Sequence, residues 1–227
     1  MNNRLFIIYI TLITSTLSVF SQSYENDAAL WLSAGLEKPI NEKFSLYLDH
    51  KCRINNNVSN YSLSYVKGGV SYSVFNWLKI EGDYGYGKQL QKEFYYLTKH
   101  RFNFSAFFKI GIDKFDIVYR NRTQARLTDK EIGNKDLVQN CHNRSRLAIK
   151  YELSKRVKPY ASYEIYCPLY HFSKIIFDRS RTEIGVNYKL TRNSSVEIFY
   201  MFQQDLYWKD KPKRDFILGL GYSFELN

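Results

Sequence analysis

Arginine recurs at every second position in three separate segments of the chain. The pairs are Arg120 and Arg122, Arg144 and Arg146, and Arg179 and Arg181. Alternate side chains of an extended strand point to the same face, so each pair would present two guanidinium groups to one surface. A guanidinium group binds carboxylates and phosphates through two parallel hydrogen bonds. The chemistry expected of this pattern is therefore ion pairing or the recognition of an anion.

Carboxylates follow the same alternation. We place Arg101 and a set of acids on the face that carries the arginine pairs, and these acids are Asp49, Glu81, Asp83, Asp116, Glu152, Glu164, Glu183 and Glu197. The residues expected to do chemistry are called the charge ladder. It consists of Arg101, Arg120, Arg122, Arg144, Arg146, Glu164, Arg179, Arg181, Glu183 and Glu197.

Two hairpins would bring members of the charge ladder together. A hairpin centred on Ser154 places Arg144 directly opposite Glu164. Directly opposed residues of unlike charge stabilise a pair of strands by roughly 0.2–1 kcal/mol. Centring the next hairpin on Asn193 places Glu183 opposite Gln203 and Lys189 opposite Glu197.

The elements that position these residues are predicted to be strands. Alternation gives about eleven of them in an all-β chain rich in Tyr and Phe. They are expected near 28–37, 44–54, 61–74, 77–87, 98–110, 114–124, 140–152, 158–167, 178–190, 195–204 and 214–226. Short connections alternate with mostly longer polar ones, as in antiparallel transmembrane barrels with short turns at one end and longer loops at the other.

Each strand also has an apolar face. In the last strand this face comprises Phe216, Leu218, Leu220, Tyr222, Phe224 and Leu226. A soluble barrel would turn such a face inward around an apolar ligand, whereas a membrane barrel turns it outward to lipid and keeps its charges inside. The pattern alone leaves both arrangements open.

The N-terminus favours export. Residues 1–21 combine a short positive region with an apolar core from Leu5 to Phe20, which is typical of a signal peptide cleaved before Gln22. Residues 22–227 then form one domain, an outer-membrane β-barrel. Its formal charge is +10, the +11 of the whole chain less Arg4. In an exported chain this charge favours outer-membrane lipids and lipopolysaccharide as partners over nucleic acid.

The C-terminal strand carries a further hint. Gly219 to Phe224 is similar to the assembly signal of bacterial outer-membrane barrels, in which alternating aromatic residues end the last strand. The match is partial, because Glu225 to Asn227 continue beyond the aromatic residues. It implies the barrel-assembly machinery of a Gram-negative bacterium as a partner.

Short motifs along residues 22–227 resemble an uncharacterised family of outer-membrane β-barrels common in Bacteroidota, domain of unknown function 2490. The motifs are Leu30 to Leu32, Glu37 to Pro39, Phe44 to Arg53, Asn143 to Arg146, Pro159 to Glu164 and Arg179 to Arg181. The resemblance implies a barrel in the outer membrane and supplies no activity or catalytic residue.

Strand number and closure are less constrained. Single-chain bacterial barrels have even strand numbers, so we expect ten to twelve strands and favour twelve, with residues 22–27 as a source of the additional one.

Cys141 and Cys167 are each thirteen residues from Ser154, so the hairpin centred on Ser154 would make them a candidate disulfide. The oligomeric state is not predicted.

Catalytic and cofactor signals are weak. The four histidines, His50, His100, His142 and His171, are expected near one rim without a Ser-His-acid signature. Gly82 to Lys88 is glycine-rich, but its glycines alternate with Tyr along a strand, where they relieve crowding or permit curvature. No metal site or cofactor is predicted.

Three function classes follow from these patterns. The favoured class is an outer-membrane barrel that is either structural, with a lumen sealed by paired charges, or a small polar or anion-binding channel. The second is an outer-membrane enzyme that modifies lipid or lipopolysaccharide, including catalytic use of the carboxylates. The third is a soluble secreted β-barrel that binds an apolar ligand.

Overall fold

The alternation of polar and apolar residues produces eleven β-strands in the part of the chain that the structure describes. The computed structural model describes residues 24–90, 96–128, 141–169, 177–206 and 212–227. The strands are β1 (Glu25–Pro39), β2 (Phe44–Asn55), β3 (Asn60–Phe75), β4 (Leu78–Leu90), β5 (Tyr96–Ile112), β6 (Phe115–Thr128), β7 (Cys141–Tyr151), β8 (Val157–Pro168), β9 (Arg179–Lys189), β10 (Ser194–Asp205) and β11 (Lys213–Glu225).

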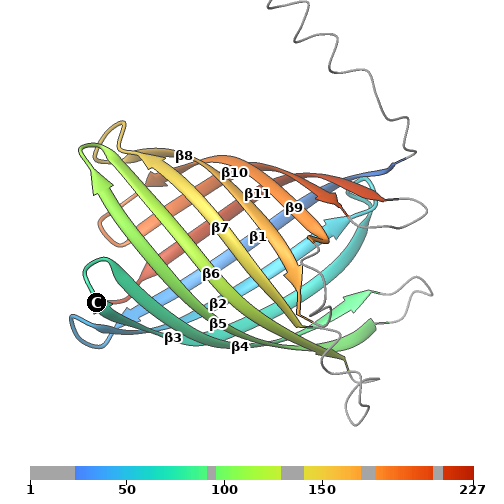
Figure 1. Ribbon diagram of the computed structural model, residues 1–227, viewed down its shortest axis with the longest axis horizontal. Helices are drawn as coiled ribbons and strands as arrows, with labels where there is room; N and C mark the ends of the chain where they lie inside the picture. The colour runs from blue at the N-terminus through green and yellow to red at the C-terminus, as the bar shows by residue number, and fades with distance from the viewer. Residues whose placement is uncertain (1–23, 91–95, 129–140, 170–176, 207–211) are drawn as a thin grey trace, which may run out of the picture.

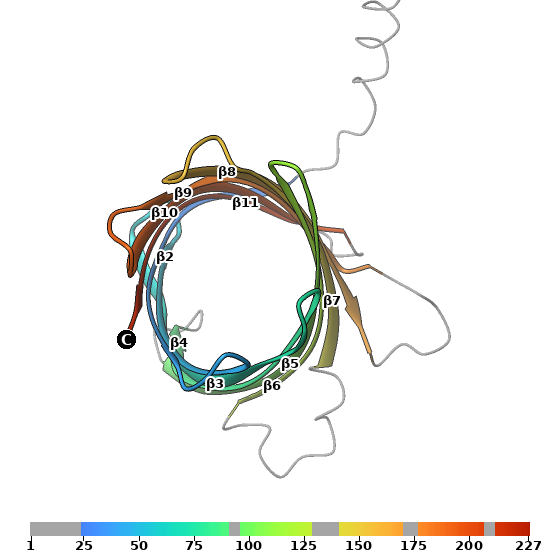
Figure 2. The same ribbon diagram turned by 90° about the vertical axis from the view of Figure 1, so that its left-hand side faces the viewer.

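The strands form one closed barrel in which each strand pairs with its neighbours in sequence (Figure 1). Figure 2 shows the ring of strands from one end. All pairs are antiparallel except the closing one, in which β1 runs parallel to β11. Closure satisfies the backbone groups that an open sheet leaves at its edges.

The predicted all-β antiparallel barrel is confirmed, and the predicted strands are present with bounds that differ by a few residues. The favoured count of twelve is wrong. Residues from Glu25 onward extend β1 instead of forming a further strand. With eleven strands in up-and-down order, the first and the last run in the same direction, which is why the seam between them is parallel.

Apolar side chains face outward and polar side chains face inward. Phe104, Ile110 and Ile184 are 59%, 60% and 58% exposed. Among the described residues, about twice as many polar or charged residues as hydrophobic residues are buried. Arg144 and Glu164 belong to this buried polar group. A soluble barrel that binds an apolar ligand requires the reverse distribution, so the third function class conflicts with this fold.

The two ends of the barrel differ in their connections. Residues 40–43, 76–77, 113–114, 152–156 and 190–193 link strands at one end, which we call the turn end. The opposite end, called the loop end, carries the connections 56–59, 91–95, 129–140, 169–178 and 206–212. β1 begins at the loop end and β11 finishes at the turn end (Figure 1).

The connection between β2 and β3 is held against β1. Asn56, Asn57 and Val58 have φ of 57°, 54° and 61° in the left-handed region. The Asn57 amide donates to Asp27 Oδ1 at 2.8 Å, and the Val58 amide donates to the Ala28 carbonyl oxygen at 3.1 Å. These bonds stabilise a conformation that is rare for a β-branched residue such as Val58.

The glycine-rich segment of β4 relieves crowding inside the barrel, as predicted. A Cβ atom at Gly85 would lie 1.8 Å from the Tyr65 hydroxyl oxygen, and one at Gly87 would lie 2.2 Å from the Ser64 carbonyl oxygen. Glycine at these positions lets β3 and its tyrosine approach the inner face of β4. No phosphate-binding loop is formed there.

The predicted signal peptide, residues 1–21, lies outside the described residues. None of the described residues forms a helix long and apolar enough to cross a membrane.

Candidate functional site

All ten members of the charge ladder line one cavity inside the barrel. The cavity has a volume of about 220 Å³ and is bordered by residues from nine of the strands. Its basic lining residues are Lys51, Arg53, Lys67, Arg101, Arg120, Arg122, Arg126, Arg144, Arg146, Arg179 and Arg181. Its acidic lining residues are Glu164, Glu183 and Glu197. The lining therefore has a large excess of positive charge.

Glu164 on β8 gathers three of the arginines. Arg144 Nη2 donates to Glu164 Oε2 at 2.9 Å and to Oε1 at 3.0 Å, and Arg120 also donates to this carboxylate. Arg181 Nη1 lies 3.6 Å from Glu164 Oε2. Because Glu164 is only 5% exposed, these charge-assisted bonds replace its lost hydration.

Two further carboxylates neutralise one arginine each. Arg146 Nη2 donates to Glu183 Oε1 at 2.8 Å, and the Tyr160 hydroxyl donates to the same oxygen at 2.8 Å. Arg179 Nε donates to Asp205 Oδ1 at 3.0 Å near the loop end. These contacts confirm that ion pairing is part of the chemistry of the charge ladder.

The register of the two hairpins differs from the prediction. Glu164 lies directly opposite Arg146. Arg144 lies opposite Tyr166, and its side chain contacts Glu164 diagonally across the two strands. The five-residue connection 152–156 centres the hairpin on residue 155, because the Ser154 hydroxyl accepts the Val157 amide at 3.1 Å and the turn closes around it. The Arg144–Glu164 pair is thus present, but not as directly opposed residues.

The predicted pairs of β9 and β10 are also wrong. Glu183 lies opposite Met201, Glu197 opposite Asn187, and Lys189 opposite Ser195. The Thr191 hydroxyl accepts the Ser194 amide at 3.0 Å, which fixes a turn whose centre is residue 192 instead of 193.

The shift in the hairpin of β7 and β8 also removes the basis for the predicted disulfide. Cys167 lies opposite Asn143, not Cys141. Both cysteines carry thiols rather than a disulfide.

Five basic residues of the cavity are not neutralised by a carboxylate in the described part of the chain. Arg122 Nε donates to Ser105 Oγ at 2.7 Å, and Arg126 Nε donates to Gln124 Oε1 at 3.0 Å. Arg101 lies 4.7 Å from the Tyr65 ring centroid. The other two are Lys51, which is exposed to the lumen, and Arg53, which lies 3.7 Å from the Trp31 ring centroid.

Opposite the arginine-rich wall, the cavity has an apolar side. Ala29, Met201 and Ile217 form a buried cluster against which Trp31 and Phe199 pack. Trp31, Phe199 and Met201 all line the cavity. The cavity is thus basic on one side and apolar where Trp31 of β1 and Phe199 and Met201 of β10 line it.

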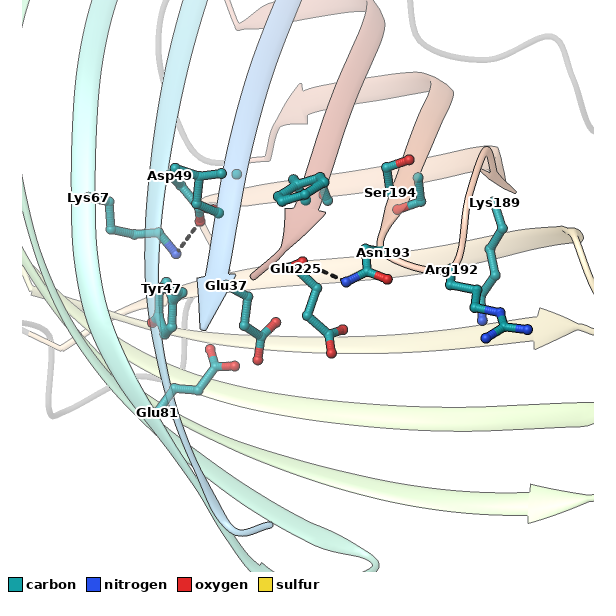
Figure 3. Close-up of a pocket in the computed structure, with 15 residues that line it drawn as sticks. Glu37, Tyr47, Asp49, Lys67, Glu81, Lys189, Arg192, Asn193, Ser194 and Glu225 are labelled. Atoms are coloured by element: carbon teal, nitrogen blue, oxygen red, sulfur yellow. Dashed lines mark hydrogen bonds and ion pairs between the residues drawn. The ribbon is translucent and has the colours of Figure 1, made fainter. Parts of the chain in front are cut away.

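A second cavity lies at the turn end. It has a volume of about 380 Å³ and is bordered by the carboxylates of Glu37, Glu81 and Glu225 and by the basic side chains of Lys189 and Arg192 (Figure 3). Lys67 lines both cavities and lies 2.9 Å from Asp49 Oδ2 and 3.8 Å from Asp83 Oδ2. The basic cavity and the more acidic turn end therefore meet at this ion-paired lysine.

The described histidines give little support to the enzyme interpretation. His50 Nε2 bonds Ser64 Oγ at 3.2 Å, while His142 Nε2 bonds Asp178 Oδ2 at 3.0 Å. The serine and the acid thus contact different histidines. His100 contacts the Tyr84 hydroxyl at 2.7 Å, and His171 lies outside the described residues. No group of three or more metal-ligating side chains occurs among the residues that the structure describes.

Sequence reasoning missed several lining residues. Arg126 follows Arg120 and Arg122 in the same alternation but lies beyond the predicted end of its strand at residue 124. Lys51 and Arg53 follow Asp49 in phase on β2 and could have been included. Trp31 and Tyr166 carry no charge, so the alternation of arginine and carboxylate gave no signal for them.

The comparison with protein families identifies the relationship of this chain. The family model described as "Protein of unknown function (DUF2490)" matches residues 28–214. The chain belongs to the DUF2490 family. No curated protein sequence matches this DUF2490 protein.

Solved structures similar to the DUF2490 protein include three bacterial barrels. The NanC porin is 9% identical, with 88% of this chain and 99% of that chain covered and a TM-score of 0.48. The β-domain of the Bordetella autotransporter BrkA is 10% identical, with coverage of 80% and 81% and a TM-score of 0.44. The translocator domain of the autotransporter NalP from Neisseria meningitidis is 10% identical, with coverage of 73% and 70% and a TM-score of 0.43.

Proposed function

We propose that this DUF2490 protein is an outer-membrane barrel whose basic lumen admits small anions. The observation that carries the proposal is the lining of the inner cavity, where eleven Lys and Arg side chains face three carboxylates. The alternative of a purely structural barrel, sealed by mutually neutralising charges, calls for similar numbers of both signs.

The outward apolar face supports a position in a membrane. Lipid offers no hydrogen bonds, so a spanning sheet must be closed and apolar on its outside. The closed strand order and the exposed Phe104, Ile110 and Ile184 meet both requirements. The signal peptide expected at residues 1–21 and the alternation of short and long connections favour the outer membrane of a Gram-negative bacterium.

The electrostatics of the lumen support selectivity for anions. A passage lined by charges of one sign raises the local concentration of ions of the opposite sign. Lys51 is exposed within the lumen, and it has no carboxylate partner among the described residues. An anion that enters from solution would therefore be attracted by groups that the protein itself does not neutralise.

Current measurements across planar lipid bilayers test this proposal. With protein reconstituted from detergent and a KCl gradient across the bilayer, we expect a reversal potential of the sign that indicates chloride over potassium. Lys51→Glu should weaken that selectivity, because it exchanges a lumen cation for an anion. Lys155→Glu makes the same change in the exposed turn 152–156 and should leave the selectivity unchanged.

Two outcomes would overturn the proposal. Bilayers that contain folded protein but carry no current would favour a sealed structural barrel. Extraction of the native protein into aqueous buffer without detergent would overturn the membrane location.

We further propose that lipid and lipopolysaccharide cover the outer face, and that the barrel-assembly machinery recognises β11. Phe216, Leu218, Leu220 and Tyr222 point outward along this strand, which supports the assembly signal expected from the sequence. Phe224, the last aromatic residue of that signal, is half-buried and borders the turn-end cavity.

A further inference from the structure

Arginines on the neighbouring strands β5, β6 and β7 lie directly opposite one another. Arg101 lies directly opposite Arg126, Arg122 opposite Arg144, and Arg120 opposite Arg146. Like charges directly opposite each other on neighbouring strands are destabilising. A protein that needed these arginines only to fill its lumen would be more stable with carboxylates at some of these positions.

Carboxylates of the protein relieve only part of this repulsion. Glu164 binds Arg120 and Arg144, and Glu183 binds Arg146. The pair Arg101–Arg126 receives no carboxylate within ion-pair distance in the described part of the chain. Among the residues that the structure describes, Arg122 is likewise bound only through its Nε, which donates to Ser105 Oγ.

Three of the arginines without a carboxylate among the described residues, Arg101, Arg122 and Arg126, line the cavity from β5 and β6. Nε of Arg126 is anchored on Gln124, which is 1% exposed. Nε of Arg122 is anchored on Ser105, which is fully buried. Among the described residues no hydrogen bond or ion pair involves a terminal guanidinium nitrogen of Arg101, Arg122 or Arg126. Nε of Arg101 is buried without a hydrogen-bond partner among the same residues.

We propose that Arg101, Arg122 and Arg126, with Lys51 and Arg53 on β2, bind a small anion that carries two or more carboxylate or phosphate groups. Such a ligand would lie between Arg101 and Arg126 and replace their repulsion by charge-assisted hydrogen bonds. A cavity of about 220 Å³ is smaller than the roughly 300–1,000 Å³ of pockets for drug-sized ligands, so the ligand is small. The inference rests on the proposed function, because the ligand reaches this site through a lumen that admits anions.

Thermal unfolding of the purified full chain in detergent tests the site. Citrate supplies carboxylates and pyrophosphate supplies phosphates, and sodium chloride at the same ionic strength controls for screening. At saturating concentration, at least one of the two multivalent anions should raise Tm by roughly 5 °C or more over the chloride control. The anion that gives the larger shift identifies the preferred chemistry.

Arg126→Gln is the informative variant, and Arg156→Gln in the turn 152–156 is its matched control. Arg126→Gln removes one member of the opposed pair, so its Tm without multivalent anion should be higher than that of the native protein. Its shift with citrate or pyrophosphate should be lost, while Arg156→Gln should keep the native Tm and the native shift. Arg101→Gln removes the other member of the opposed pair, so it should give the same rise in Tm and the same loss of the shift.

The site is overturned if neither anion raises the native Tm, or if Arg126→Gln retains the full shift. It is also overturned if Arg126→Gln unfolds at a lower temperature than the native protein without anion, because the pair would then not be repulsive.

Chloride selectivity in bilayers is measured separately. A protein that is selective for chloride but shows no shift keeps the proposed function and loses the site, whereas absent selectivity overturns the proposed function itself.

Discussion

At the scale of single residues, Glu164 organises the basic wall of the lumen. One buried carboxylate contacts Arg120, Arg144 and Arg181, which come from three different strands. Losing Glu164 and losing one of its arginines have unequal consequences. Loss of one arginine leaves Glu164 with two others, whereas loss of Glu164 leaves three guanidinium groups without their carboxylate.

We therefore expect Glu164→Gln to destabilise the barrel more than Arg144→Gln does. Removing one partner from a buried ionic cluster costs about 3–5 kcal/mol when the remaining charge stays uncompensated. Urea unfolding of the protein in detergent micelles measures the difference. Glu152→Gln is the control, because its pair with Lys158 at 3.3 Å is exposed and surface pairs contribute roughly 0–1 kcal/mol. Equal losses for Glu164→Gln and Glu152→Gln would contradict the role assigned to Glu164.

At the scale of the elements, the sequence predicted which face each strand turns inward but not which residues oppose each other. Faces follow from a period of two, so Arg120, Arg144 and Arg179 could be assigned to the lumen without a structure. Which residues lie directly opposite each other on two strands depends on where the turn between the strands is centred. Hydrogen bonds of Ser154 and Thr191 within the turns fixed those centres one residue away from the predicted ones. A shift of one residue in the centre moves every partner by two positions and keeps the face, which is why the charge ladder was found and its partners were not.

Close packing of β3 against β4 gives an expectation for Gly87. Gly87→Ala would place Cβ 2.2 Å from the Ser64 carbonyl oxygen and 2.7 Å from Tyr65 Cα, and neither backbone atom can move independently of the sheet. Such overpacking costs about 1–3 kcal/mol. Gly82→Ala on the same strand meets nothing within 4 Å and serves as the control. Urea unfolding should show a lower midpoint for Gly87→Ala alone, and a lowering of the same size in both variants would argue against the crowding.

At the scale of the whole molecule, alternation predicted about eleven strands, but it could not predict that eleven strands close the barrel through a parallel seam. The even-number expectation came from other single-chain barrels, whereas the pattern of residues 22–27 is compatible with either outcome. The structure joins them from Glu25 onward to β1, which pairs with β11 from Glu25–Lys213 to Glu37–Glu225. The strand that begins the barrel and the strand that ends it therefore start at the same end. The basic cavity likewise arises only when strands distant in sequence share one lumen.

A cysteine pair across the seam tests this closure. In the parallel register Ser33 lies opposite Gly221, and a Cβ at Gly221 would be 3.0 Å from Ser33 Oγ. With Cys52, Cys141 and Cys167 replaced by Ser, Ser33→Cys with Gly221→Cys should form a disulfide under mild oxidation, seen as a mobility shift on a non-reducing gel. The control is Ala29→Cys with Gly221→Cys. Ala29 pairs with Ile217, four residues from Gly221, so about 13 Å separates the control positions and exceeds the reach of a disulfide. A twelfth strand between β1 and β11 would prevent the bond in the first pair, and an antiparallel seam would not favour Ser33 over Ala29.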